Sequence, residues 1–143
     1  MATADIRPSW LSQVRRIALD LPEATEKQTW DHPTFRVRDK IVAGIGVDDI
    51  FAGTGIDEDV TDRRSNGTNP VTTMSMKATP GEQESLLASG HPFFRPRYVG
   101  HRGWIGVIID DDTDWSEIEE LVIDSYRTIA PKTLARQLDD PTP

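Results

Sequence analysis

Apolar residues recur every three or four positions in two segments of the chain, a spacing typical of amphipathic helices. The first segment contains Trp10, Leu11, Val14, Ile17, Ala18 and Leu21. Ser9 can cap this helix and Pro22 ends it. The second segment contains Trp115, Ile118, Leu121, Val122, Tyr126 and Ile129. Asp114 can cap it, and beyond Pro131 the segment "PKTLARQL" either continues the helix or forms a last short one.

Strands are predicted where polar and apolar residues alternate or where short apolar runs occur. These segments are "TFRVR" (34–38), "KIVAGIGV" (40–47), "VTTMSMKA" (71–78) and "WIGVIID" (104–110), and "DIFAG" can extend the sheet. The first two are joined by Asp39, as in a hairpin, and "PEATEKQT" reads as a polar connector before them. The last is apolar on both faces, which predicts a central strand.

The order of these elements predicts the fold class. A short helix is expected over 80–89, because Thr79 can cap it, Pro80 suits its first position and Gly90 suits its end. The predicted elements occur in the order helix, several strands, helix, strand, helix. This order differs from the strict alternation of a parallel α/β fold, and the strand connections are too short for parallel crossovers. We therefore expect an α+β fold with a mainly antiparallel sheet.

The length of 143 residues fits a single domain spanning 1–143. Within it, the stretch from 48 to 70 is acidic and poor in apolar residues, which predicts an exposed flexible loop. Residues 139–143 are expected to be a disordered tail. The absence of cysteine, of a signal-peptide pattern and of a long apolar run predicts a cytoplasmic protein without membrane contact.

Charge narrows the range of partners. A net charge of −8 disfavours loose binding to nucleic acid or anionic membrane, which depends on neutralising phosphates. The stretch 91–106, "HPFFRPRYVGHRGWIG", nevertheless carries three arginines and no acid, whereas 110–120, "DDDTDWSEIEE", holds seven acids and no base. A local basic and aromatic patch is therefore compatible with the overall charge.

Several chemical motifs are incomplete. The glycines of "GIGVDDIFAGTG" lack the third glycine and the following helix of a dinucleotide site, and "DDDTDW" lacks the glycine and the last glutamate of a calcium loop. His32, His91 and His101 are not paired at a metal-binding spacing, and there is no nucleophile elbow. We expect no metal, no cofactor and no catalytic residue, so an enzyme is the weakest interpretation, open only through His101 as a general base.

One constellation of side chains suggests binding. Arg36 and Arg38 alternate with Phe35 and Val37 and are expected on the outer face of a strand. With the later basic stretch, the candidate contacts for nucleic acid or another ligand are Arg36, Arg38, Arg95, Arg97, His101 and Arg102. The aromatic residues near them are Trp30, Phe35, Tyr98 and Trp104. Guanidinium groups beside rings suit phosphates and bases, but the rings can equally fill the core while the arginines pair with acids.

Four stretches, "LPEAT", "HPTFRVRDKIVA", "FFRPRYVGHRGWIGVIID" and "DWSEIEELVIDSYRTIAPKTLARQL", resemble the MmcQ/YjbR family of small bacterial proteins. The resemblance covers roughly 9–138, and residues 48–70 depart from it. It implies a CyaY-like, frataxin-like fold of the double-wing type, with helices packed on one face of an antiparallel sheet, and a DNA-binding role. It brings no catalytic residues.

Two functional hypotheses follow. The first is a non-catalytic module that binds DNA through the basic and aromatic face of its sheet. The second is a small-molecule-binding or sequestering protein with a pocket between the sheet and the Tyr98–Trp104 turn, walled by the aromatic residues named above. The sequence leaves the oligomeric state and the role of residues 48–70 open.

Overall fold

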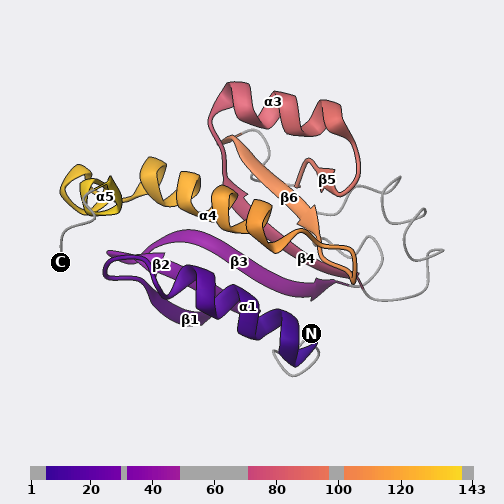
Figure 1. Ribbon diagram of the computed structural model, residues 1–143, viewed down its shortest axis with the longest axis horizontal. Helices are drawn as coiled ribbons and strands as arrows, with labels where there is room; N and C mark the ends of the chain where they lie inside the picture. Colours follow the sequence, from indigo (N-terminus) through magenta and orange to yellow (C-terminus); the bar gives the residue numbers. More distant parts are fainter. Residues whose placement is uncertain (1–5, 30–31, 49–70, 97–101, 140–143) are drawn as a thin grey trace.

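A six-stranded antiparallel sheet with the order β1-β2-β3-β4-β6-β5 forms the centre of the computed structural model (Figure 1). The structure describes residues 6–29, 32–48, 71–96 and 102–139. The strands are β1 (Thr25–Thr29), β2 (His32–Val37), β3 (Lys40–Asp48), β4 (Val71–Lys77), β5 (Phe93–Phe94) and β6 (Trp104–Ile108). The expected α+β fold with an antiparallel sheet is confirmed.

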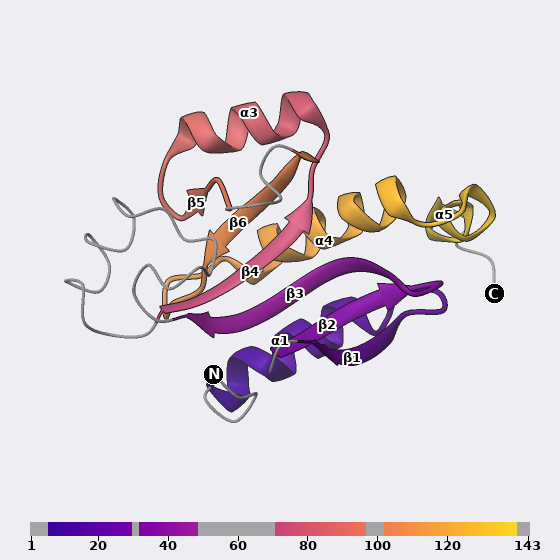
Figure 2. The same ribbon diagram turned by 180° about the vertical axis from the view of Figure 1, so that it is seen from behind.

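The described helices are α1 (Pro8–Ala18), α3 (Pro80–Ser89), α4 (Trp115–Ile129) and α5 (Lys132–Asp139). α4 packs across β3 and β4, and α1 lies beside it against β3. Seen from behind, the strands lie in front of α1 and α4 (Figure 2). α3 packs against β5 and β6, at the other end of the sheet. α1 and α4 therefore cover one face of β2–β4.

The main core lies between the sheet and these helices. Its strand residues include Phe35, Ile45, Met74, Met76, Ile105 and Val107, all at most 1% exposed. Its helix residues include Val14, Ile17, Ile118, Val122 and Tyr126. The buried helix residues recur at helical spacing and the buried strand residues at strand spacing. The apolar positions of the sequence therefore account for both layers of the core. A smaller cluster of Val71, Phe94 and Ile108 lies apart from this core.

Helix ends follow the sequence signals in α3 and α4. Thr79 accepts a hydrogen bond from the Glu82 amide, and Asp114 accepts from the amides of Ser116 and Glu117, as expected of N-caps. The prediction for Ser9 is wrong: α1 begins at Pro8 and its N-cap is Arg7, two residues before Ser9, and Arg7 makes no side-chain cap hydrogen bond. Proline is favoured at the first helical position because its missing N–H has no helical acceptor there.

Two strands do not follow from the sequence pattern. β1, in "TEKQT", is a polar edge strand paired with β2, whereas its composition predicts a connector. β5 has only two residues and pairs with β6, which thereby has neighbours on both sides. The β2–β3 hairpin turns at Arg38 and Asp39, both with positive φ (50° and 66°), the backbone of a tight two-residue turn.

Residues 49–70 and 140–143, which contain nearly all of the predicted loop and tail, lie outside the described residues. None of the described helices combines the length and the apolar character needed to cross a bilayer.

Candidate binding face of the sheet

One face of the sheet is left uncovered by α1 and α4, and we call it the open face. In an antiparallel pair, residues opposite one another point to the same side. Starting from the core-facing residues, the register assigns these residues to the open face: Thr25, Lys27, Thr29, His32, Thr34, Arg36, Ile41, Gly44, Gly46, Thr73, Ser75, Lys77, Trp104, Gly106 and Ile108. The open face is thus mainly polar, with two glycines on β3 and one on β6.

The open face is basic although the chain is acidic. It carries Lys27, Arg36 and Lys77, together with His32. Among the strand residues whose side chains the structure describes, the register assigns no acid to this face. Glu26 on β1 points the other way and pairs with Arg15 of α1 through two hydrogen bonds of 2.8 Å. In β1, strand alternation therefore puts Lys27 on the open face and Glu26 on the covered side.

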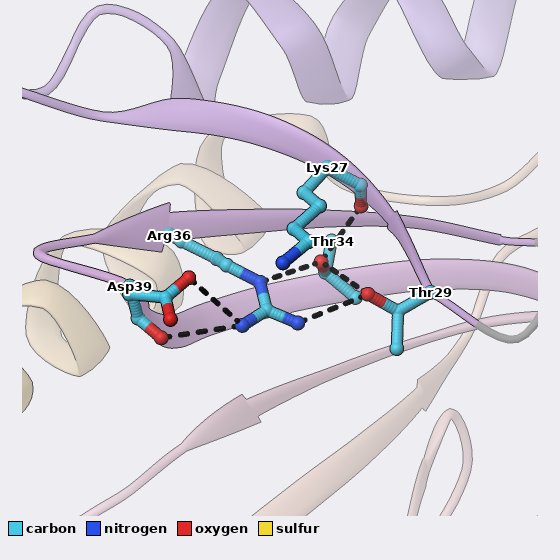
Figure 3. A network of polar contacts seen from close by, with 5 residues as sticks. All are labelled: Lys27, Thr29, Thr34, Arg36 and Asp39. Atoms are coloured by element: carbon cyan, nitrogen blue, oxygen red, sulfur yellow. Dashed lines mark hydrogen bonds and ion pairs between the residues drawn. The ribbon is translucent and has the colours of Figure 1, made fainter.

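Arg36 is held firmly on the open face. Its Nε donates to Thr34 Oγ1 at 3.2 Å, and its terminal nitrogens donate to Thr29 Oγ1 at 3.0 Å and to the backbone carbonyl of Asp39 at 3.2 Å (Figure 3). The Asp39 carboxylate lies 3.4 Å away. Thr34 in turn donates to the carbonyl of Lys27 at 2.8 Å. Only 14% of the Arg36 side chain is exposed, so this arginine orders the β1–β2 edge and offers part of its guanidinium to solvent.

Arg38 does not share a face with Arg36, and the prediction of a stripe formed by both is wrong. Arg38 has left the strand and lies in the turn, where it donates to both carboxylate oxygens of Glu23 at 2.7 and 3.1 Å. The preceding residue, Pro22, accepts a hydrogen bond from Tyr126 of α4. Arg38 therefore belongs to the helix side of the sheet and is already engaged by an acid.

The later arginines lie toward the opposite edge. Arg95 is exposed directly after β5, and four strand spacings separate β5 from β2, roughly 19 Å. Arg102 is exposed before β6, and its carbonyl accepts from Lys77 Nζ at 2.7 Å. Lys77 and Arg102 line a cavity of about 360 Å³ beside the start of α3. Of the predicted basic residues that the structure describes, Arg36 and Arg102 thus lie near open-face lysines, whereas Arg95 stands apart.

A second cavity, of about 150 Å³, opens on this face, and we call it the Trp104 pocket. Its lining residues are His32, Thr34, Ile41, Gly44, Ser75 and Trp104. Gly44 and Ser75 are paired across β3 and β4 and form its floor. Of the aromatic residues predicted to line a pocket, Trp104 does so. Phe35 does not, because it points into the main core and is 1% exposed.

Four predicted site residues, Trp30, Arg97, Tyr98 and His101, lie outside the described residues. Over the residues that the structure does describe, no group of three His, Cys, Asp or Glu side chains is arranged to hold a metal ion.

A family model described as YjbR matches residues 19–128, most of the chain. The chain belongs to the YjbR family. This confirms the resemblance carried by "HPTFRVRDKIVA" and "YVGHRGWIGV". No curated protein matches the sequence.

Two solved structures have a similar fold. A crystal structure of a Pseudomonas syringae protein aligns with a TM-score of 0.62 and 19% identity, over 86% of this chain and 98% of that one. A Deinococcus radiodurans protein with a DUF419 domain gives a TM-score of 0.60 and 18% identity, over 92% of this chain and 88% of that one. At such identities the likeness concerns the fold alone.

Three residues of the open face of this YjbR protein had no signal in its sequence. Lys27 lies in β1, which is too polar to suggest a strand. Only the strand register shows that Lys27 points to the open face and Glu26 to the covered one. Lys77 reads as the end of a strand, and Ser75 as an ordinary outward residue. The strand order that brings them together depends on pairings between distant segments, which local patterns do not specify.

Proposed function

We propose that this YjbR protein is a non-catalytic module that binds nucleic acid, DNA in the first instance, through the open face of its sheet. The observation that supports the proposal is the charge of that face: its described side chains carry Lys27, Arg36 and Lys77, while the chain as a whole carries −8. Such a separation gives a local surface suited to phosphates on an otherwise acidic molecule.

The net charge still limits the strength of binding. At about 0.1 M salt the Debye length is about 10 Å, so acids on the helix side of the sheet are largely screened from a strand lying on the open face. Contacts within hydrogen-bonding distance persist under the same conditions. We therefore expect modest affinity, and single strands are favoured because an exposed sheet offers stacking and backbone contacts to unpaired nucleotides.

The three cations have different roles in this proposal. Lys27 is exposed and forms no ion pair within the described part of the chain, so its ammonium group is available for a phosphate. Arg36 is oriented by its threonine and Asp39 contacts and offers a fixed guanidinium edge. Lys77 is tethered to the Arg102 carbonyl and places a positive charge next to Trp104, its partner across β4 and β6.

The test is a fluorescence-anisotropy titration of labelled single- and double-stranded DNA at several salt concentrations. The wild-type protein should bind, and Lys27→Ala should lower the affinity and reduce the salt slope by about 1. Arg16→Ala is the matched control, because it removes the same charge from an exposed residue of α1 on the covered side. The proposal is overturned if the protein binds neither single- nor double-stranded DNA. It is also overturned if Lys27→Ala and Arg16→Ala lower the affinity equally.

A second function, binding of a small molecule, is favoured by one specific observation, the Trp104 pocket. Its aromatic wall, glycine floor and hydroxyl groups combine apolar surface with a few polar groups, as ligand sites do. A thermal-shift screen against metabolites tests this function: a compound at 100 times its Kd should stabilise the protein by about 2.7 kcal/mol. A screen in which no compound shifts the unfolding temperature counts against it.

A further inference from the structure

Gly44 occupies the middle of β3 without any need for a glycine there. Within the part of the chain that the structure describes, the nearest atoms to a Cβ built on it lie 3.7 Å away, which is ordinary van der Waals contact. At Gly46 the same atom would come within 3.3 Å of the His32 side chain, and at Gly106 within 2.4 Å of Phe94. Packing therefore accounts for Gly106 and makes the space at Gly46 tight, whereas it leaves the glycine at 44 unexplained. Glycine inside a strand often marks a place where a ligand approaches the backbone closely.

The space above Gly44 is the Trp104 pocket. Its volume, about 150 Å³, is well below the roughly 300–1,000 Å³ of sites that enclose a whole drug-sized molecule. A cavity of about 150 Å³ is comparable to the size of one planar ring, so the remainder of a larger ligand would lie outside it. Trp104 on β6 and His32 on β2 supply rings on either side of the floor made by Gly44 and Ser75.

Polar groups at the pocket are few and differ in availability. The Thr34 hydroxyl is already engaged by Lys27, Thr29 and Arg36. The Ser75 hydroxyl makes no hydrogen bond within the part of the chain that the structure describes, so it can donate to or accept from a ring edge. Lys77, opposite Trp104 in the register, supplies a positive charge next to the pocket.

We infer that the Trp104 pocket takes one unpaired base of a bound single strand, with the neighbouring phosphate near Lys77. This rests on the proposed function and adds a binding mode to it: the open face holds the backbone by charge, and the pocket holds one base through its rings and the Ser75 hydroxyl. Since a paired base cannot leave its partner without cost, the pocket favours single strands over duplex.

The experiment compares two labelled strands of about 12 nucleotides, one of thymidine and one of abasic sites with the same phosphates. Base stacking is expected to make the thymidine strand bind about 5- to 100-fold more tightly. Gly44→Ala adds one methyl group to the floor, and it should weaken thymidine binding about tenfold and leave abasic binding unchanged. Trp104→Ala should act in the same direction and Trp104→Phe should restore most of the affinity. Gly44→Ala keeps the test valid if removal of Trp104 impairs folding.

Each outcome separates this inference from the proposed function. Equal binding of the thymidine and abasic strands overturns the base pocket and leaves binding through the open face standing. Binding of neither strand overturns both. A third outcome is that the protein binds free thymidine monophosphate but not the strand, and that Gly44→Ala abolishes this binding. That outcome overturns the strand as occupant and supports the small-molecule function.

Discussion

Ser125 on α4 donates its hydroxyl to the backbone carbonyl of Val42 in β3 at 2.7 Å, across 83 residues of sequence. The same oxygen accepts the backbone N–H of Lys77, at the end of β4, at 3.0 Å. Val42 lies where the β2–β3 register shifts, so its carbonyl is not served by an ordinary ladder bond. One hydroxyl thus joins the helix to both central strands that carry the floor of the Trp104 pocket.

Ser125→Ala should lower the free energy of unfolding by about 2–3 kcal/mol. The serine is fully buried, and its loss leaves a buried carbonyl and a partly buried N–H without their partner. Urea denaturation measures the change. Thr128→Ala is the control, since its exposed hydroxyl bonds only to the Asp124 carbonyl one turn earlier, and the change should be within about 0.5 kcal/mol. Equal effects of the two substitutions would show that the bridge is unimportant.

Glu82→Gln should stabilise the protein at neutral pH. Burial raises the pKa of Glu82, as does its hydrogen bond with Asp124 of α4, while a backbone hydrogen bond from Thr79 lowers it. A carboxyl whose pKa is raised on folding stabilises the fold below its ordinary pKa of about 4.3, and this contribution is lost as pH rises through the raised value. The charge repulsion at pH 7 is absent in the glutamine variant.

Thermal unfolding at pH 4 and pH 7 measures this effect. The advantage of Glu82→Gln should be present at pH 7 and should shrink at pH 4, where the wild-type carboxyl is protonated. Glu84→Gln removes the same charge from an exposed position of the same helix and should change little at either pH. An advantage of Glu82→Gln that is the same at both pH values would contradict a raised pKa of Glu82 in the folded protein.

Arg38→Ala should leave nucleic-acid affinity unchanged, because Arg38 lies on the helix side and is paired with Glu23. The hydrogen bond from Arg38 lowers the pKa of Glu23, so the substitution should raise that pKa toward its ordinary value. Carboxyl NMR of Glu23 follows the second change and anisotropy the first. A loss of affinity equal to that of Lys27→Ala would place Arg38 in the binding surface after all.

The contrast between Arg36 and Arg38 shows what the sequence can predict. Alternation correctly put Phe35 and Val37 on the side opposite Arg36, because a strand has a period of two, although Phe35 lies in the core and not in the predicted pocket. It failed one residue later, where positive φ ends the strand and turns Arg38 toward Glu23. Local patterns carry the period of an element but mark its end poorly when no glycine or proline stands there.

The candidate site was less predictable than the fold. Apolar periods predicted α1 and α4, and the caps Thr79 and Asp114 marked the starts of α3 and α4, because these signals lie within or next to each element. The order of the elements and the short connections between strands predicted the antiparallel sheet. The Trp104 pocket combines side chains from β2, β3, β4 and β6, and its floor depends on a register that pairs Gly44 with Ser75. The basic and aromatic stretch before β6 predicted Trp104 and Arg102 as site residues. Only the strand order shows that Lys27 and Lys77 lie on the same face.

Gly106→Ala and Gly44→Ala should change stability in opposite directions, although both residues belong to the open face. Phe94 covers Gly106 so closely that a Cβ would lie 2.4 Å from its ring, and Phe94 is itself 5% exposed, so the ring has little room to move. Gly106→Ala should therefore cost about 1–3 kcal/mol through overpacking. Gly44→Ala should gain about 0.5–1 kcal/mol, because alanine reduces the conformational freedom of the unfolded chain and meets no close contact.

A double-mutant cycle with Phe94→Ala identifies the cause of the loss at Gly106. Without the ring there is space for the added methyl group, so Gly106→Ala should cost much less in the Phe94→Ala protein than in the wild type, with a coupling of about 1 kcal/mol or more by urea denaturation. The effect of Gly44→Ala should be the same in both backgrounds, since Phe94 is not among the atoms near it. If the loss at Gly106 persists without the ring, the backbone and not Phe94 requires glycine there. If Gly44→Ala is destabilising, the floor of the pocket is filled by the protein itself and has no room for a base.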